Sequence, residues 1–95
     1  MARNYEWDPR KAAANRRKHG ISFEEALAVF GDSLAVIHSD PDHSSSEIRE
    51  VIIGHSLRSR LLVVSFTEGS GTVRILSARG ATTSERVEYE EGTNS

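Results

Sequence analysis

The sequence lacks cysteine altogether, and it contains two prolines and one tryptophan among 95 residues. The absence of cysteine excludes disulfides and thiolate metal sites, and it suits a reducing compartment. No apolar run approaches the roughly 18 residues that cross a membrane, and the N-terminal stretch lacks the apolar core of a signal peptide. We therefore expect a single cytoplasmic domain over residues 1–95. Its size is near the lower limit for a hydrophobic core that has no disulfide or metal to support it.

The net charge of −2 conceals a strong segregation of charge along the chain. Residues 1–20 carry six basic and two acidic side chains, and residues 21–56 carry one basic and seven acidic ones. Residues 57–80 are basic again, with four basic side chains against one acidic, and the remaining tail is acidic. Two basic blocks could fold into one positive face suited to phosphates. Alternatively, they are solvated surfaces that pair within the molecule.

Local signals predict two consecutive helices near the N-terminus. Asp8 and Pro9 have the residue types of an N-cap and a first helical position, and Gly20 suits a left-handed C-cap. The second helix is predicted to begin at once, because Ser22 and Glu25 have the spacing of a capping box. Apolar residues at helical spacing follow this box.

The rest of the chain predicts a sheet and a final helix. Strands are expected at 4–7, 34–37, 47–55, 60–68 and 72–79, and a helix at 82–91. The connections between the last three strands are short, with GSG at 69–71 as a hairpin turn, which favours an antiparallel meander. The expected fold is α+β, with two N-terminal helices and a C-terminal helix packed on a twisted antiparallel β-sheet in the order β-α-α-β-β-β-β-α.

Familiar catalytic and metal-binding motifs are missing. The four histidines have no metal-ligand spacing, and neither a phosphate-binding loop nor a serine-hydrolase elbow occurs. Arginines on or beside the predicted strands usually pair with carboxylates such as Glu47 or Glu68, although several together could form a phosphate-binding surface. These strand arginines are Arg49, Arg60, Arg74 and Arg79.

Cleavage of RNA without a metal suits a surface of this kind. The 2′-hydroxyl of the RNA attacks the neighbouring phosphate, so the protein positions the substrate, transfers protons and neutralises charge. Arginine or lysine can neutralise the charge. The residues available for proton transfer are His19, His55, Glu68 and Tyr89. The composition permits this chemistry and does not select it.

Residues 5–32 read YEWDPRKAAANRRKHGISFEEALAVFGD, and LLVVSFTE, VRILSAR and ERVEYEE follow in that order. Over about residues 5–91 this pattern resembles the BrnT family of type II toxin–antitoxin toxins. The resemblance implies a RelE-like fold and an endoribonuclease that inhibits translation. It also implies a BrnA-like antitoxin with a ribbon-helix-helix DNA-binding part as partner, so that operator DNA is contacted only through the antitoxin. No membrane partner is implied.

The resemblance carries expectations for the site as well, with no metal or other cofactor. The expected catalytic residues are His19, Glu68, Arg74 and Arg79, of which the arginines would stabilise the phosphate transition state and His19 or Glu68 would transfer protons. The expected RNA-binding residues are Lys18, Arg58 and Arg60.

The sequence departs from the family pattern at four positions where basic residues are often found, which are Gly69, Gly80, Thr83 and Ser84. Each lost cation weakens phosphate binding. One alternative is therefore a weakened or inactive homologue that binds the antitoxin and acts as a co-repressor of its own operon. Another is a DNA-binding module acting alone, against which the lack of a helix-turn-helix or basic arm argues.

Overall fold

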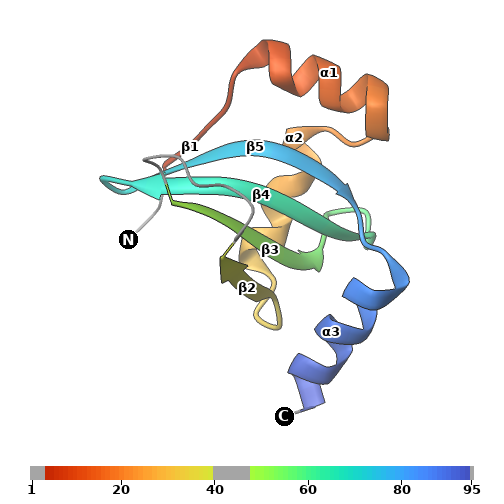
Figure 1. The fold of residues 1–95 in the computed structure, drawn as a ribbon. Helices are drawn as coiled ribbons and strands as arrows, with labels where there is room; N and C mark the ends of the chain where they lie inside the picture. The colour runs from red at the N-terminus through yellow and green to blue at the C-terminus, as the bar shows by residue number, and fades with distance from the viewer. Residues whose placement is uncertain (1–3, 40–47, 95) are drawn as a thin grey trace.

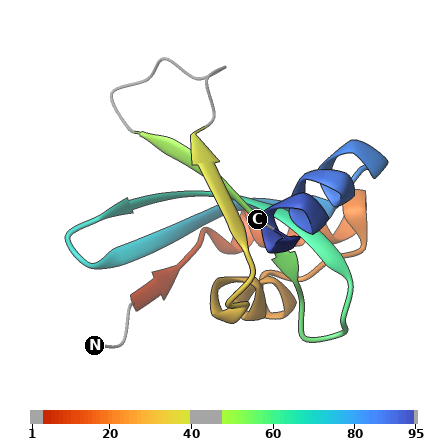
Figure 2. The ribbon, with the colours of Figure 1, turned by 90° about the horizontal axis from the view of Figure 1, so that it is seen from below.

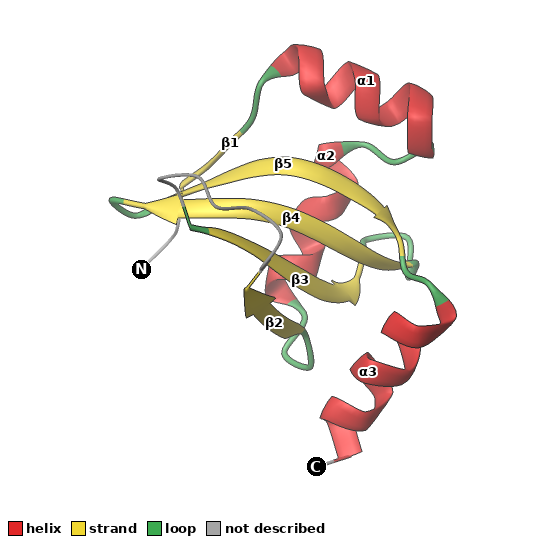
Figure 3. Cartoon of the chain, viewed as in Figure 1, coloured by secondary structure: helices red, strands yellow, loops and turns green. Residues whose placement is uncertain are grey.

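The computed structural model describes residues 4–39 and 48–94, which form one five-stranded sheet and four helical segments (Figures 1 and 3). The strands are β1 (Asn4–Glu6), β2 (Val36–Ser39), β3 (Arg49–His55), β4 (Leu61–Gly69) and β5 (Thr72–Gly80). The helices are α1 (Pro9–His19), α2 (Phe23–Ala26), the 3₁₀ helix η1 (Leu27–Gly31) and α3 (Thr83–Asn94). The predicted α+β class and element order are confirmed. Glu47, and most of the polar stretch HSDPDHSSSE at 38–47, lie outside the described residues.

The strand order across the sheet is β1-β5-β4-β3-β2. Strands β2 to β5 form the expected antiparallel meander. Strand β1 differs from the expectation, because it pairs with β5 in parallel, with Asn4 opposite Thr72 and Glu6 opposite Arg74. No hairpin joins these two strands, so no turn imposes an antiparallel direction on them.

The predicted helix boundaries follow from local hydrogen bonds. The side chain of Asp8 accepts a hydrogen bond from the backbone N–H of Arg10 at 2.8 Å, and α1 ends at Gly20, whose φ is 70°. The Oγ of Ser22 accepts from the backbone N–H of Glu25 at 3.1 Å. The second helix is shorter than expected, because after Ala26 the chain tightens into the 3₁₀ turns of η1.

The β4–β5 connection is a hairpin turn at the predicted position, and its loop has two residues because Gly69 still belongs to β4. Its central residues Ser70 and Gly71 have φ angles of 55° and 78°, which the primed hairpin turns require. In two perpendicular views the tip of this hairpin lies at the opposite end of the molecule from α3 (Figures 1 and 2).

The core lies on both faces of the sheet. The larger cluster fills the space between the sheet and α1, α2 and η1, and it includes Phe23, Val64 and Phe66. The smaller cluster lies on the other face, where Tyr89 of α3 packs against Ile53. Because α3 crosses only one end of this second face, the end nearer the β4–β5 hairpin has no helix over it in the described part of the chain.

Asn15 joins α1 to the free edge of β5. Its Nδ2 donates to the carbonyl oxygens of Ala78 at 2.8 Å and Ile21 at 3.0 Å, and its Oδ1 accepts from the N–H of Ala78 at 3.1 Å. The side chain thus pairs with β5 as a neighbouring strand would, because β1 stops opposite Arg74 and leaves the rest of this edge open. This explains the asparagine between the basic residues of α1.

Candidate functional site

The predicted site residues lie in separate places on the molecule. Arg60 and Glu68 stand at opposite ends of β4, about 25 Å apart at roughly 3.3 Å per residue. Lys18 and His19 are on the last turn of α1. Arg79 is at the end of β5, next to α3. The structure therefore brings some of these residues together in pairs and does not gather all of them in one pocket.

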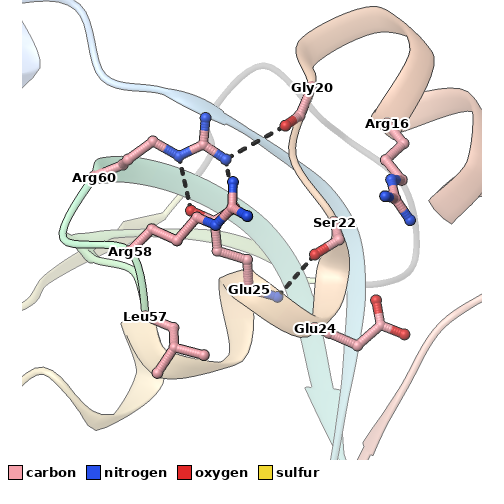
Figure 4. Close-up of a pocket in the computed structure, with 8 residues that line it drawn as sticks. All are labelled: Arg16, Gly20, Ser22, Glu24, Glu25, Leu57, Arg58 and Arg60. Atoms are coloured by element: carbon pink, nitrogen blue, oxygen red, sulfur yellow. Dashed lines mark hydrogen bonds and ion pairs between the residues drawn. The ribbon is translucent and has the colours of Figure 1, made fainter.

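Arg60 holds a buried carboxylate between α2 and the β3–β4 turn (Figure 4). Its Nε donates to Oε2 of Glu25 at 2.8 Å, its NH2 donates to Oε1, and the same NH2 reaches the carbonyl of Gly20 at 3.3 Å. The Oγ of Ser56 also donates to Glu25, at 2.6 Å. The Arg60 hydrogen bonds lower the pKa of Glu25 to about 2 against the opposing effect of burial, and Ser56 adds to the lowering. Arg60 therefore has a structural task, although its side chain is 42% exposed.

A pocket of about 270 Å³ lies beside this ion pair (Figure 4). Arg16, Arg58 and Arg60 line it together with Glu24 and Glu25. Arg16 and Arg58 are exposed, and neither side chain makes an ion pair within residues 4–39 and 48–94. The pocket rim thus offers two uncommitted cations, one of them the predicted RNA-binding residue Arg58.

Arg79 is held by α3. Its NH1 and NH2 donate to the two carboxylate oxygens of Glu85 at 2.8 and 2.7 Å, a bidentate arrangement. Hydrogen bonds from Arg79 lower the pKa of Glu85 to about 2 against burial, with help from the backbone N–H of Thr82. Glu85 and Thr82 also form a capping box, in which the N–H of Glu85 donates to Oγ1 of Thr82. Arg79 thus fixes the start of α3, and it can contact a phosphate only by sharing or releasing Glu85.

Glu68 and Arg74 border the same hollow of about 470 Å³ near the β4–β5 hairpin. The NH1 of Arg74 donates to Oε2 of Glu6 at 2.5 Å, and the two side chains are 44% and 51% exposed. An exposed pair of this kind is weak. By strand alternation Glu68, which lies opposite Val73, belongs to the helix-covered face, whereas Arg74 belongs to the other face.

Lys18 and His19 border a hollow of about 300 Å³ that Ser77 of β5 also lines. Both side chains are exposed, and neither forms a hydrogen bond or ion pair with a described residue. Gly20 ends the helix directly after them. The structure therefore leaves both free to contact a ligand at the edge of β5.

A cluster of Asp32, His55 and Tyr89 was not predicted as a unit. The hydroxyl of Tyr89 donates to Oδ2 of Asp32 at 2.8 Å, and Nδ1 of His55 is 3.1 Å from the same hydroxyl. Burial would raise the pKa of Asp32, but hydrogen bonds from the backbone N–H groups of His55 and Leu34 and from Tyr89 lower it overall. Burial and the bond to Asp32 raise the pKa of Tyr89 to about 12. The members are far apart in the sequence, so no local pattern could have joined them.

The described residues contain neither a cluster suited to a metal ion nor a membrane-spanning helix. Within the described ranges, no group of three or more His, Asp or Glu side chains is placed to hold a metal ion. None of the helices in this part of the chain has the length and apolar character needed to cross a membrane.

Two comparisons with known proteins define the class to which this chain belongs. A family model described as the ribonuclease toxin, BrnT, of type II toxin–antitoxin systems matches residues 7–85. This chain belongs to the BrnT family. The fold also matches the crystal structure of the Brucella abortus ribonuclease toxin BrnT with a TM-score of 0.58 and 24% sequence identity, over 86% of this chain and 100% of that one. The comparison with curated proteins gave no match.

Proposed function

We propose that this BrnT-family chain is an active endoribonuclease that needs no metal, inhibits translation and is neutralised by a BrnA-like ribbon-helix-helix antitoxin. The observation that carries the proposal is the family match over residues 7–85, which names a ribonuclease toxin of a type II system. The exposed cations of the described surface support it, since a phosphodiester substrate needs such groups.

In the proposed mechanism the 2′-hydroxyl of the RNA attacks the adjacent phosphorus, and the 5′-oxygen of the next nucleotide leaves. Arg74 stabilises the charge that develops on the phosphate, because its bond to Glu6 is exposed on both sides and is easily exchanged for a phosphate. Arg79, near the end of the same strand, adds a second positive charge to this stabilisation. Glu68 or His19 accepts the proton of the 2′-hydroxyl, and the departing 5′-oxygen takes up a proton from water, which leaves a 2′,3′-cyclic phosphate and a 5′-hydroxyl.

The remaining predicted residues hold the RNA outside the reacting bond. Lys18 contacts the backbone at the edge of β5, and Arg58 does so at the rim of the Glu25 pocket. Arg60 contributes through the exposed part of its guanidinium while it remains bound to Glu25. These contacts are electrostatic and position the strand without reading its sequence.

The proposal is tested by inducible expression in a bacterial host, with and without the neighbouring antitoxin gene. The expected result is growth arrest with degraded RNA, and co-expression of the antitoxin should restore growth. In Arg74→Ala the amount of degraded RNA should fall at least tenfold. Arg86→Ala, on the exposed surface of α3, is the matched control and retains arrest. Normal growth with intact RNA, at a confirmed level of folded protein, would overturn the enzymatic function.

A specific observation favours a second function, that of a non-cleaving co-repressor bound to the antitoxin. Carboxylates already occupy three of the predicted arginines, Arg60, Arg74 and Arg79, and the family's basic positions carry Gly69, Gly80, Thr83 and Ser84 here. This function predicts a stable complex with the antitoxin and an antitoxin-dependent operator shift, with no RNA cleavage by the free chain. The two functions are separated by measuring cleavage and complex formation on the same preparation.

A further inference from the structure

The second face of the sheet is polar where α3 does not cover it. Across the strands, Arg49 lies opposite Thr67, which lies opposite Arg74. In the next row on the same face, Val51 lies opposite Ser65, which lies opposite Ser77, so this row has one apolar side chain and two hydroxyl groups. We refer to Arg49, Ser65, Thr67, Arg74 and Ser77 as the open face; all are half-buried except Arg74, which is exposed.

Arg49 differs from the other strand arginines in its hydrogen bonds. Arg60, Arg74 and Arg79 each bind a carboxylate, and the Nε of Arg60 donates to Glu25 at 2.8 Å. The Nε of Arg49 is buried and has no hydrogen-bond partner, and no ion pair joins Arg49 to any described residue. Among these four arginines, Arg49 is therefore the one whose charge no described carboxylate neutralises, and a half-buried arginine of this kind is suited to an anionic ligand.

We propose that Arg49 binds a phosphate of the RNA substrate on the open face, beside Arg74. Arg49 and Arg74 are two strands apart, or about 10 Å between Cα atoms, which lets both guanidinium groups contact one phosphate or two successive ones. Because the Nε of Arg49 is buried, the two terminal nitrogens of its guanidinium form the fork that matches two phosphate oxygens. The inference rests on the proposed function for the identity of the substrate.

The rest of the open face suits a nucleic acid strand. Hydroxyl groups of Ser65, Thr67 and Ser77 can donate to phosphate oxygens and exchange hydrogen bonds with the ribose 2′-hydroxyl. Ser77 also lines the hollow that contains Lys18 and His19. The open face therefore connects the Arg74 hollow to the end of α1, so that RNA lying across β3, β4 and β5 would also meet Lys18 and His19.

The alternative occupant is an acidic side chain of the antitoxin. A carboxylate could satisfy the Arg49 fork, but a row of hydroxyl groups adds little to protein recognition, whereas every nucleotide of RNA presents a phosphate and a 2′-hydroxyl. We therefore favour RNA and treat antitoxin binding as an outcome of the test.

The test compares Arg49→Gln, Arg49→Lys and the control Arg86→Gln in the purified chain, using a fluorescent single-stranded RNA. Arg49→Gln is expected to weaken binding and kcat/KM at least tenfold, and to lower the slope of log affinity against log salt by about 0.7. Arg49→Lys restores the charge but not the fork, so it recovers only part of the loss. The melting temperature should not fall in either variant, because the Nε donor of Arg49 has no partner to lose. Arg86→Gln should resemble the wild type.

The possible failures are distinguishable. If the wild type cleaves RNA and Arg49→Gln behaves like Arg86→Gln, the inference is overturned and the proposed function stands. If the wild type binds RNA through Arg49 without cleaving it, the inference holds and the proposed enzymatic function falls. A loss of antitoxin affinity in Arg49→Gln, with RNA binding unchanged, would assign the site to a protein carboxylate and overturn the inference. A wild type that neither binds nor cleaves RNA overturns both.

Discussion

At the scale of single residues, Glu25 takes part in two separate interactions, one through its backbone N–H and one through its carboxylate. Its backbone N–H completes the predicted cap with Ser22, but its carboxylate does not turn back to the helix end as a capping box requires. The carboxylate instead accepts hydrogen bonds from Arg60 and Ser56, and its side chain is only 8% exposed. Glu25 therefore stabilises the junction between α2 and the β3–β4 turn.

Removing this carboxylate should destabilise the fold. We expect Glu25→Ala to lower the free energy of unfolding by about 1–3 kcal/mol, because the buried hydroxyl of Ser56 would lose its acceptor. The measurement is equilibrium denaturation in urea. The matched control is Glu24→Ala, an exposed neighbour that should change stability by no more than about 0.5 kcal/mol. Equal effects of the two substitutions would contradict this role of Glu25.

The same carboxylate predicts the acid limb of the stability curve. The pKa of Glu25 is about 2 in the folded chain, below its ordinary value of 4.5, so its stabilisation is complete above about pH 4.5 and is lost as the pH falls towards 2. Glu85 acts in the same direction. Urea denaturation between pH 2 and 7 should show a shallower acid loss in Glu25→Gln than in the wild type. Stability curves that run parallel in the variant and the wild type would show that Glu25 has the same pKa in the folded and unfolded chain, which would contradict this prediction.

At the scale of elements, α3 is attached to the sheet by side chains of β5, of β2 and of the loop that precedes β2. Arg79 binds Glu85 near its start, Tyr89 reaches Asp32 in its middle, and Glu88 lies 3.1 Å from Nε2 of His38 on β2.

The Tyr89–Asp32 bond should contribute measurably to the docking of α3. Tyr89→Phe keeps the ring contacts with His55 and removes the hydroxyl that donates to Asp32. The expected loss is about 0.5–1.5 kcal/mol of unfolding free energy, with faster amide exchange in α3. Tyr5→Phe serves as the control, since no described hydrogen bond uses its hydroxyl. Unchanged exchange in α3 would mean that packing alone holds the helix.

The edge of β5 depends on Asn15 in a comparable way. Asn15→Ala removes both amide contacts to Ala78 and leaves its buried N–H without a partner, so we expect a loss of about 2 kcal/mol or more. Arg17→Ala, exposed on the same helix, is the control. Hydrogen exchange at Ala78 reports the effect directly, and full protection in Asn15→Ala would contradict it.

Much of this architecture could be predicted from the sequence, because helix ends and tight turns depend on neighbouring residues. Asp8 caps α1, and Gly20 and Gly71 have the left-handed φ that glycine favours at a helix end and in a hairpin turn. The partners of the arginines could not be predicted, since Glu6 is 68 positions from Arg74 and Glu25 is 35 from Arg60. The direction of β1 was equally hidden, as no turn links it to β5.

At the scale of the whole molecule, some of the segregated charges pair within the molecule and others stay available to an anionic ligand. Arg60, Arg74 and Arg79 each pair with a carboxylate from another charge block, and the partly buried pairs of Arg60 and Arg79 stabilise the tertiary structure. Lys18, Arg49 and Arg58 have no ion pair in the described part of the chain. These three cations could contact a polyanion without breaking an ion pair, and they lie at separate places around the sheet rather than in a single cleft.

The central claim is that this BrnT-family chain cleaves RNA by attack of the 2′-hydroxyl. Its most direct test is mass spectrometry of the products formed when the purified chain is incubated with RNA in excess EDTA. The proposed mechanism predicts cleavage that persists in the chelator and fragments that end in 2′,3′-cyclic phosphate. RNA that stays intact with folded protein, or cleavage that stops in EDTA, would contradict it.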